Sequence, residues 1–391
     1  MHPFSPAMAA TFPPPVMEAR RWLDGVTFSP ERPLINVSQA APVAAPPEAL
    51  RAHMAQLLRD DASTHLYGPV LGLPALRAEL AARMSTLYRG DVTPDRIAIT
   101  AGCNQAFCAA VSTLAAPGDE IILPLPWYFN HKMWLDMTQL RAVPLPTGDD
   151  LMPDPDAAAQ RITSRSRAIV LVSPNNPAGV AYPPALIDAF RDLARRNGLA
   201  LIVDETYRDF HPAEGAPHAL FGDPDWDDTL IHLYSFSKAY RLTGHRVGAI
   251  AASPARLAQI EKFLDTVSIC PPQIGQHAAL WGLQNLADWL ARERAEILRR
   301  CAALRTEMAG LDGWRLLGAG AYFAYVTHPH AVPSPELAQR LVREAGVLML
   351  PGTMFMPEGE AAAARQMRIA FANADGDGIS RLVARLSDWR P

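Results

Sequence analysis

The chain has 391 residues, of which 49% are hydrophobic, and its formal net charge at neutral pH is −4. This length predicts two or three domains with a large apolar core. A slightly acidic chain without a basic patch offers no electrostatic basis for binding nucleic acid or an acidic membrane. No apolar run approaches the ~20 residues of a membrane span, and the start of the chain lacks a secretory signal, so we expect a cytoplasmic protein. The four cysteines have neither metal-ligand nor disulfide spacing, so we predict no metal site.

The first half of the chain reads as a proline-rich arm followed by alternating strands and helices. Residues 1–45 form the arm, with one short helix expected at Val16–Leu23. Helical periodicity then appears at Pro47–Arg59 and Leu73–Tyr88. From there, short apolar runs alternate with amphipathic stretches, which favours βαβ units and a mostly parallel sheet. We expect helices at Asn104–Leu114 and Pro184–Asn197, and strands at Ile97–Thr100, Glu120–Pro124, Ala168–Val172, Leu199–Val203, Leu230–Ser235 and Val247–Ala251.

The second half predicts a passage into a smaller domain. The amphipathic stretch Ile274–Ala309 is too long for one helix of a compact domain without a break, and its length suits a connection between domains. The remainder reads as α+β, with a helix at Ser334–Ala345, a final helix, and strands at Ala321–Val326, Val347–Leu350 and Met367–Phe371. We therefore divide the chain into 1–45 (arm and part of the small domain), 46–285 (large domain) and 286–391 (C-terminal small domain).

Lysine is rare in this chain, and one lysine stands in a distinctive place. There are three lysines against 33 arginines, and Lys238 ends the sequence Ser-Phe-Ser-Lys after an apolar run. A partly buried lysine can lose its proton and form an imine, whereas arginine stays protonated. Arg246 follows eight residues later. An imine-forming lysine near hydroxyls and a fixed cation indicates a phosphate-bearing aldehyde, pyridoxal phosphate (PLP), although a single lysine is more often a solvated surface group.

Further candidate residues follow the carboxyl ends of the predicted strands, where open α/β sheets bind ligands. Gly102 and Cys103 begin a helix whose free N–H groups could bind phosphate, or they form an ordinary turn. Tyr128 could stack on a flat heterocycle or belong to the core. Asn176 could donate a hydrogen bond to a phenolate oxygen, and Asp204 could pair with a pyridinium nitrogen or cap a helix.

In combination these motifs are much more specific than any one of them. Asn-Asn-Pro-x-Gly at 175–179, Asp-Glu-x-Tyr at 204–207 and Ser-x-Ser-Lys at 235–238, with arginine eight residues on, occur in this order. The pattern resembles the fold-type I PLP enzymes, specifically the class I/II aminotransferases related to aspartate aminotransferase, from about Leu34 to the C-terminus. The resemblance implies an α/β fold: a large PLP-binding domain with a mostly parallel seven-stranded sheet flanked by helices, and a smaller α+β domain from the N-terminal segment and the C-terminal part.

The resemblance also implies a role for each matching residue. Lys238 would hold PLP as an internal aldimine and shuttle a proton in a ping-pong transfer from an L-α-amino acid to a 2-oxo acid. Asp204 would pair with the ring nitrogen, Asn176 and Tyr207 with the ring oxygen, and Tyr128 would stack on the ring. Arg368 would clamp the substrate carboxylate; otherwise it is an exposed arginine on a strand edge. The phosphate would be held by Gly102, Cys103, Ser235, Arg246 and, from the other subunit of a homodimer, Tyr67, which is otherwise a buried aromatic.

Two departures from the family pattern leave the substrate open. Ala40 replaces a glycine that usually lies in the substrate lid, and Ala178 replaces a threonine. Ala40 and Asn176 are counted with Arg368 as substrate-binding candidates, and the side-chain pocket is expected among the loop 38–41, Trp127, Asn130, His131 and Trp134. The alternatives are a carbon–sulfur β-lyase or another eliminating or oxidising fold-type I enzyme, and a non-catalytic effector-binding module.

Overall fold

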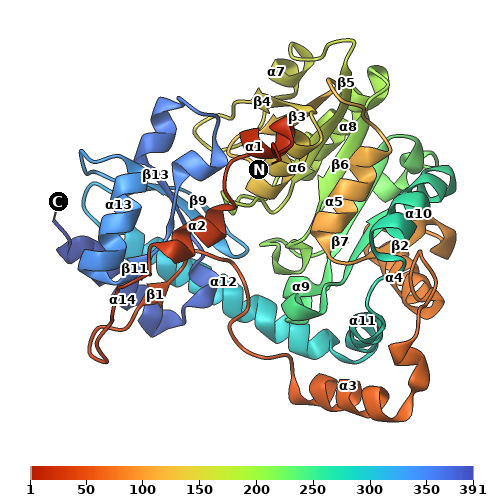
Figure 1. The fold of residues 1–391 in the computed structure, drawn as a ribbon, viewed down its shortest axis with the longest axis horizontal. Helices are drawn as coiled ribbons and strands as arrows, with labels where there is room; N and C mark the ends of the chain where they lie inside the picture. Colours follow the sequence, from red (N-terminus) through yellow and green to blue (C-terminus); the bar gives the residue numbers. More distant parts are fainter. Residues whose placement is uncertain (1, 391) are drawn as a thin grey trace.

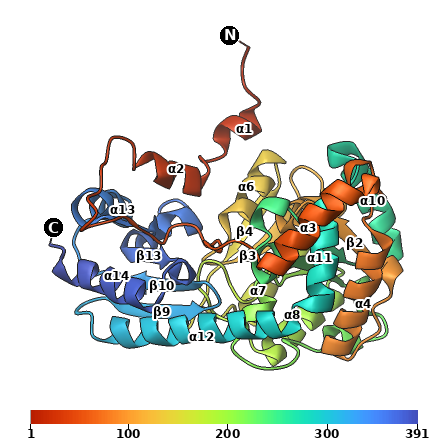
Figure 2. The ribbon, with the colours of Figure 1, turned by 90° about the horizontal axis from the view of Figure 1, so that it is seen from below.

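The computed structural model describes residues 2–390, which are organised around two sheets of different size (Figure 1). Helix α12 (Ala287–Ala309) runs along both parts and connects them (Figure 2). Helices α1 (Pro6–Ala10) and α2 (Pro15–Arg21) lie on the N-terminal arm, which projects from one side in Figure 2. Among the described residues, no helix combines the length and apolar character needed to cross a membrane.

The larger sheet has seven strands in the order β2-β8-β7-β6-β5-β3-β4, and only β8 runs antiparallel to its neighbours. This confirms the predicted mostly parallel sheet. Its strands are β2 (Ile97–Thr100), β3 (Glu120–Pro124), β4 (Arg141–Leu145), β5 (Ser166–Val172), β6 (Ala200–Asp204), β7 (Leu230–Ser235) and β8 (Gly248–Ala251). The strand that the sequence did not predict, β4, lies at the sheet edge.

Both faces of this sheet are covered, because alternate residues of its strands enter separate apolar clusters. Ile169 and Leu171 of β5 belong to one cluster, and Ala168 and Val170 belong to the other. Strands buried on both faces are continuously apolar, which explains why their sequences were recognisable. The helices of this part are α3 (Glu48–Asp60), α4 (Pro74–Tyr88), α5 (Cys103–Ser112), α6 (Phe129–Met137), α7 (Pro155–Ala159), α8 (Pro184–Arg196), α9 (Phe236–Ala239), α10 (Pro254–Ser268) and α11 (Gln273–Asn285).

The smaller sheet has the order β12-β13-β10-β9 and is entirely antiparallel. Beside it, β1 (Ile35–Asn36) pairs with β11 (Val347–Leu348), so the N-terminal segment joins the C-terminal part as predicted. The expected break in 274–309 falls at Leu286, between α11 and α12. The remaining elements are β9 (Arg315–Gly320), β10 (Phe323–Thr327), α13 (Ser334–Arg340) with a π-helical turn at Leu341–Ala345, β12 (Leu350–Pro351), β13 (Gln366–Ile369) and α14 (Gly376–Asp388).

Candidate active site

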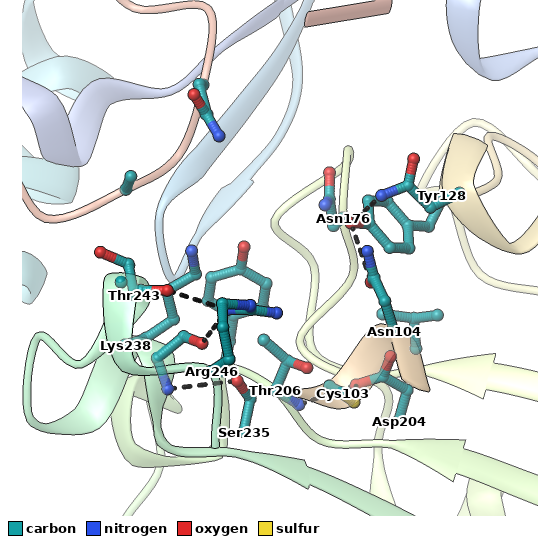
Figure 3. Close-up of a pocket in the computed structure, with 17 residues that line it drawn as sticks. Cys103, Asn104, Tyr128, Asn176, Asp204, Thr206, Ser235, Lys238, Thr243 and Arg246 are labelled. Atoms are coloured by element: carbon teal, nitrogen blue, oxygen red, sulfur yellow. Dashed lines mark hydrogen bonds between the residues drawn. The ribbon is translucent and has the colours of Figure 1, made fainter. Parts of the chain in front are cut away.

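A cavity of about 480 Å³ lies where the carboxyl ends of β3, β5, β6 and β7 meet the N-terminal segment (Figure 3). The fold brings together residues that are far apart in the sequence. Those predicted site residues that line the cavity are Cys103, Tyr128, Asn176, Asp204, Tyr207, Ser235, Lys238 and Arg246. Sequence reasoning did not assign several other lining residues, although each adjoins an assigned residue or motif: Asn104, Val172, Thr206, Ser237, Thr243 and Gly244.

Lys238 lies on the short helix α9, directly after β7, and its side chain is half-buried in the cavity wall. Its Nζ donates a hydrogen bond to the carbonyl oxygen of Ala40 at 2.7 Å. Burial, with the neighbouring cations Arg246 and Arg368, lowers the pKa of Lys238 from 10.5 to about 8. The neutral, nucleophilic amine is therefore a minor but much larger fraction of this lysine near physiological pH than of an ordinary lysine.

One end of the cavity is suited to an anion. Gly102 has a φ of +87° and precedes helix α5, whose first residues, Cys103 and Asn104, line the cavity. A side chain at Gly102 would collide with the guanidinium of Arg246. That guanidinium donates to Thr243 O at 2.9 Å and Ser237 Oγ at 3.3 Å. Among the described residues no carboxylate pairs with it, so a helix N-terminus and an uncompensated cation converge here.

Asp204 is buried at the end of β6, and three groups surround its carboxylate. Oδ1 accepts from the backbone N–H of Thr206 at 2.9 Å and from the Cys103 thiol at 3.6 Å. His131 Nε2 lies 3.4 Å from Oδ2. Burial alone would raise the pKa of Asp204, but hydrogen bonds and charge from His131 and Thr206 hold it below its ordinary value. Asp204 therefore closes a local turn and also presents an anion to the cavity.

Arg368 lies behind Asn176 and does not itself line the cavity. It is only 2% exposed, which contradicts the alternative of an exposed strand-edge arginine. It donates to Asn176 Oδ1 at 2.9 Å and to Ser38 O, and its Nε has no hydrogen-bond partner. Burial lowers its pKa to about 10. An arginine buried without a carboxylate is ready to bind one.

The two remaining predicted residues lie outside the cavity. Ala40 is buried in the apolar cluster of the small sheet, so its methyl group packs there, while its neighbours Gln39 and Ala41 line the cavity. Tyr67 is 79% exposed, so the alternative of a buried aromatic is wrong. The adjacent Gly68 N–H donates to Cys270 Sγ at 3.4 Å.

The expected side-chain pocket is only partly correct. Asn130 lines the cavity as predicted, whereas Trp127, His131 and Trp134 do not. His131 is stacked on Phe107 beneath Asp204, with ring centroids 3.8 Å apart. The Trp134 ring packs edge-on against Phe263 of α10. Helical spacing turns these side chains toward the sheet and α10 instead of the cavity.

A buried cluster beside the cavity contains Glu205, His218 and His232, whose side chains could in principle hold a metal ion. The Glu205 carboxylate lies 2.8 Å from His232 Nε2 and 3.4 Å from His218 Nε2, and it accepts from the Tyr88 hydroxyl. His218 Nδ1 accepts from Leu220 N–H, which places the proton of a neutral imidazole on Nε2, facing Glu205. The Glu205 carboxylate is thus held by hydrogen bonds from Tyr88 and with His232, while its Oε1 and His218 Nε2 have no hydrogen-bond partner. The absence of a metal stays a prediction.

Comparison with known proteins identifies the family. The family model for aminotransferase class I and II matches residues 32–386. The arginine–pyruvate transaminase AruH of Pseudomonas aeruginosa is 30% identical over 75% of this chain and 76% of its own. The aspartate aminotransferase of Sulfolobus acidocaldarius is 25% identical over 85% and 86%. The solved structure of Thermus thermophilus aspartate aminotransferase with maleate superposes with a TM-score of 0.89, at 25% identity and 99% coverage of both chains.

The chain therefore belongs to the class I and II aminotransferases. It is a PLP-dependent aminotransferase with the fold of aspartate aminotransferase.

Proposed function

We propose that this enzyme transfers the amino group of an L-α-amino acid to a 2-oxo acid in two half-reactions at the cavity around Lys238. The observation that carries the proposal is the pairing of a half-buried lysine, whose pKa is lowered to about 8, with the buried and uncompensated Arg368. The lysine supplies a neutral amine, and the arginine supplies a site for the α-carboxylate that every amino acid donor shares.

The residues around the cavity fit PLP. Its phosphate would lie at the start of α5 beside Arg246 and Ser235, where an anion is needed. Its ring would stack on Tyr128, with the ring nitrogen at Asp204 and the ring oxygen at Asn176 and Tyr207. When bound, PLP supplies an electrophilic carbonyl carbon and an electron-withdrawing pyridine ring.

The chain's own groups then have distinct tasks. Lys238 would hold the cofactor, and once released it would act as the base that moves the substrate's Cα proton. Asp204, kept anionic by His131 and Thr206, would favour a protonated ring nitrogen. Nothing in the described residues favours an eliminating or oxidising enzyme. Membership of the class I and II aminotransferases excludes the alternative of a non-catalytic effector-binding module.

We also propose that the enzyme is a cytoplasmic homodimer with shared active sites. We keep the domain boundaries after residues 45 and 285 as part of this proposal. Tyr67 is exposed with Leu66, and Val267 and Ile269 are exposed on the segment that Gly68 contacts through Cys270. Exposed large apolar side chains on two neighbouring segments are typical of an interface. A second subunit would cover them and would bring Tyr67 to the partner's phosphate site.

Borohydride reduction of the purified enzyme tests the central assignment. Peptide mass mapping should find PLP fixed covalently on Lys238, and an adduct on Lys132 or Lys262 would contradict it. Lys238→Ala should retain bound PLP but lose several orders of magnitude in rate, because nucleophile and base are lost together. Lys262→Ala is the matched control, since that lysine is exposed and its ammonium donates to Gln259 on the surface.

A further inference from the structure

Within residues 2–390 the chain passes twice between the two parts of the fold, and Arg241 contacts both passages. The first passage leads from β1 to α3, and the second is helix α12. Arg241, three residues after Lys238, donates to Glu293 Oε2 of α12 from Nη2 at 2.6 Å and from Nε at 3.1 Å. Its Nη1 donates to Ala45 O on the first passage at 3.2 Å. Figure 1 shows α9 next to α12, where this contact is made.

Arg241 reaches these partners from a strained backbone. Its φ of +56° lies in the left-handed region, which is unfavourable for an arginine and often marks a functional position. The Arg241 N–H donates to Lys238 O at 3.4 Å, so the same turn ends the helix that carries the lysine. The guanidinium also lies over the ring of Trp289 on α12, with its carbon 5.3 Å from the ring centroid. These contacts fix the orientation of a planar, five-donor group.

Stability alone does not explain the pair of Arg241 and Glu293. Both side chains are 23% exposed, and ion pairs that water reaches contribute little to the free energy of folding. The pair instead fixes the place of α12 relative to α9. Helix α12 packs against β9 and α14 of the smaller part, and its Arg300 donates to Ala372 O, four residues beyond Arg368. The contacts of Arg241 therefore extend along α12 toward the segment that carries Arg368.

The distance between the two parts matters for the substrate but not for the cofactor. The cofactor residues assigned within one subunit lie at 102–246, in the part built on the larger sheet. The α-carboxylate of the substrate would bind Arg368 of β13, in the smaller sheet, while its amino group reacts beside Lys238. An amino acid must therefore span both parts. A misplacement of about 1 Å between reacting groups can lower a rate by about a hundredfold.

We propose that Arg241 is a positioning residue for the reaction: through Glu293 and Ala45 it holds the α-carboxylate site at Arg368 at the correct distance from Lys238. The inference rests on the proposed function, since it assumes a substrate that spans these two residues. Arg241 does not line the cavity, so it acts through its partners and not by contact with substrate or cofactor. Its loss should therefore affect amino acids and spare PLP.

The test is Arg241→Met in the PLP-loaded enzyme. Methionine tolerates a φ of +56° no better than arginine does, so the comparison reports on the side chain. The kcat/KM of the best L-amino acid donor should fall by about tenfold or more, chiefly through a higher KM, because carboxylate and amino group are no longer held together. Oxime formation with hydroxylamine, which has no carboxylate and does not need Arg368, should proceed at the wild-type rate.

Two equilibrium measurements do not depend on turnover. The α-methyl analogue of the best donor has no Cα proton to lose, and absorbance gives its Kd without reaction. This Kd should rise in Arg241→Met as KM does. The Kd of PLP, measured by titration of the cofactor-free protein, should stay at the wild-type value, because the cofactor contacts lie in one part of the fold.

A second variant and a control complete the design. Glu293→Gln leaves Arg241 in place but removes the negative charge, so it should change the same quantities in the same direction by less. The double variant should be no worse than Arg241→Met if the two residues act as a pair. Arg299→Met is the control, because Arg299 is exposed on the same helix and pairs there with Glu296, and it should match the wild type.

The outcomes separate this inference from the proposed function. Wild-type values of donor kcat/KM and analogue Kd in Arg241→Met would overturn the positioning role. So would an equal loss of PLP binding and oxime formation, which general structural damage would cause. If Arg241→Met does not fold, Glu293→Gln is judged by the same quantities. If no amino acid of a broad set converts the cofactor of the wild-type enzyme, the proposed function falls and this inference with it.

Discussion

Arg368→Met should stabilise the fold while it destroys substrate binding. The wild-type guanidinium is buried without a carboxylate, and this burial lowers its pKa from the ordinary arginine value to about 10. At 1.4 kcal/mol per pKa unit, this shift corresponds to about 3 kcal/mol of destabilisation of the charged form. Removal of the cation recovers that cost but leaves Ser38 O and Asn176 Oδ1 without their donor.

The net gain follows from these two effects. Asn176 faces the cavity, where water can replace the lost donor, whereas Ser38 is buried and loses about 1–2 kcal/mol. Methionine suits the site because the rings of Phe355 and Phe323 lie 4.8 and 5.0 Å from the guanidinium carbon. We therefore expect the unfolding free energy to rise by about 1–2 kcal/mol.

Urea unfolding at fixed protein and PLP concentrations measures this change. Arg365→Met is the control, because Arg365 is exposed on the same segment, and surface substitutions usually stay within about 0.5 kcal/mol. The kcat/KM of Arg368→Met should fall by about a hundredfold or more with every donor, since the α-carboxylate loses its buried partner. A variant that is both inactive and less stable than wild type by more than about 1 kcal/mol would refute the idea of an uncompensated cation.

Three further predictions concern Asp204, Tyr67 and Glu205. Asp204→Asn should bind PLP but lose turnover, because a neutral amide no longer favours the protonated ring; near-normal kcat would reduce Asp204 to a turn residue. Dimers mixed from Tyr67→Phe and Lys238→Ala chains should contain one fully wild-type site and one doubly altered site if Tyr67 crosses the interface, whereas each site would carry one lesion if it does not. An active monomer in light scattering would contradict the shared site. Glu205, with its pKa lowered to about 2, contributes stability above its ordinary pKa of 4.5 that is lost as the pH falls toward 2. Circular dichroism in acid should show a shallower loss for Glu205→Gln.

The sequence predicted most of the large sheet because its strands are buried on both faces and therefore continuously apolar. The three strands it missed lack this pattern, and β1 is only two residues long. Strand β4 lies at the edge, where Arg141 and Pro144 are exposed and proline is tolerated. Strand β9 contains Gly318 and Gly320, which weaken the strand signal. Both glycines are required because a side chain at either would collide with the backbone of Ala178–Gly179.

The site residues that could be predicted are those that directly follow a predicted strand or belong to a sequence motif. Residues at strand ends, such as Asp204 and Lys238, follow from topology and motif. Contacts across the fold do not: His131 reaches Asp204 from α6, and its place in the sequence suggested the substrate pocket instead. The position of His131 three residues after Tyr128, at the start of a helix, could have indicated this contact, because successive side chains of a helix point to different faces.

The loop at residues 38–41 couples the two cations on which the chemistry depends. Ser38 O accepts from Arg368, and Ala40 O accepts from Lys238 Nζ. Each carbonyl occupies a donor that the reaction needs, one for the substrate carboxylate and the other for the cofactor. The loop itself is anchored, because Val37 on its N-terminal side donates to Leu348 O and Asn373 donates to Gln39 O. The Ala40 methyl group packs in the small-sheet core, so it holds the loop and its two carbonyls more firmly than glycine would.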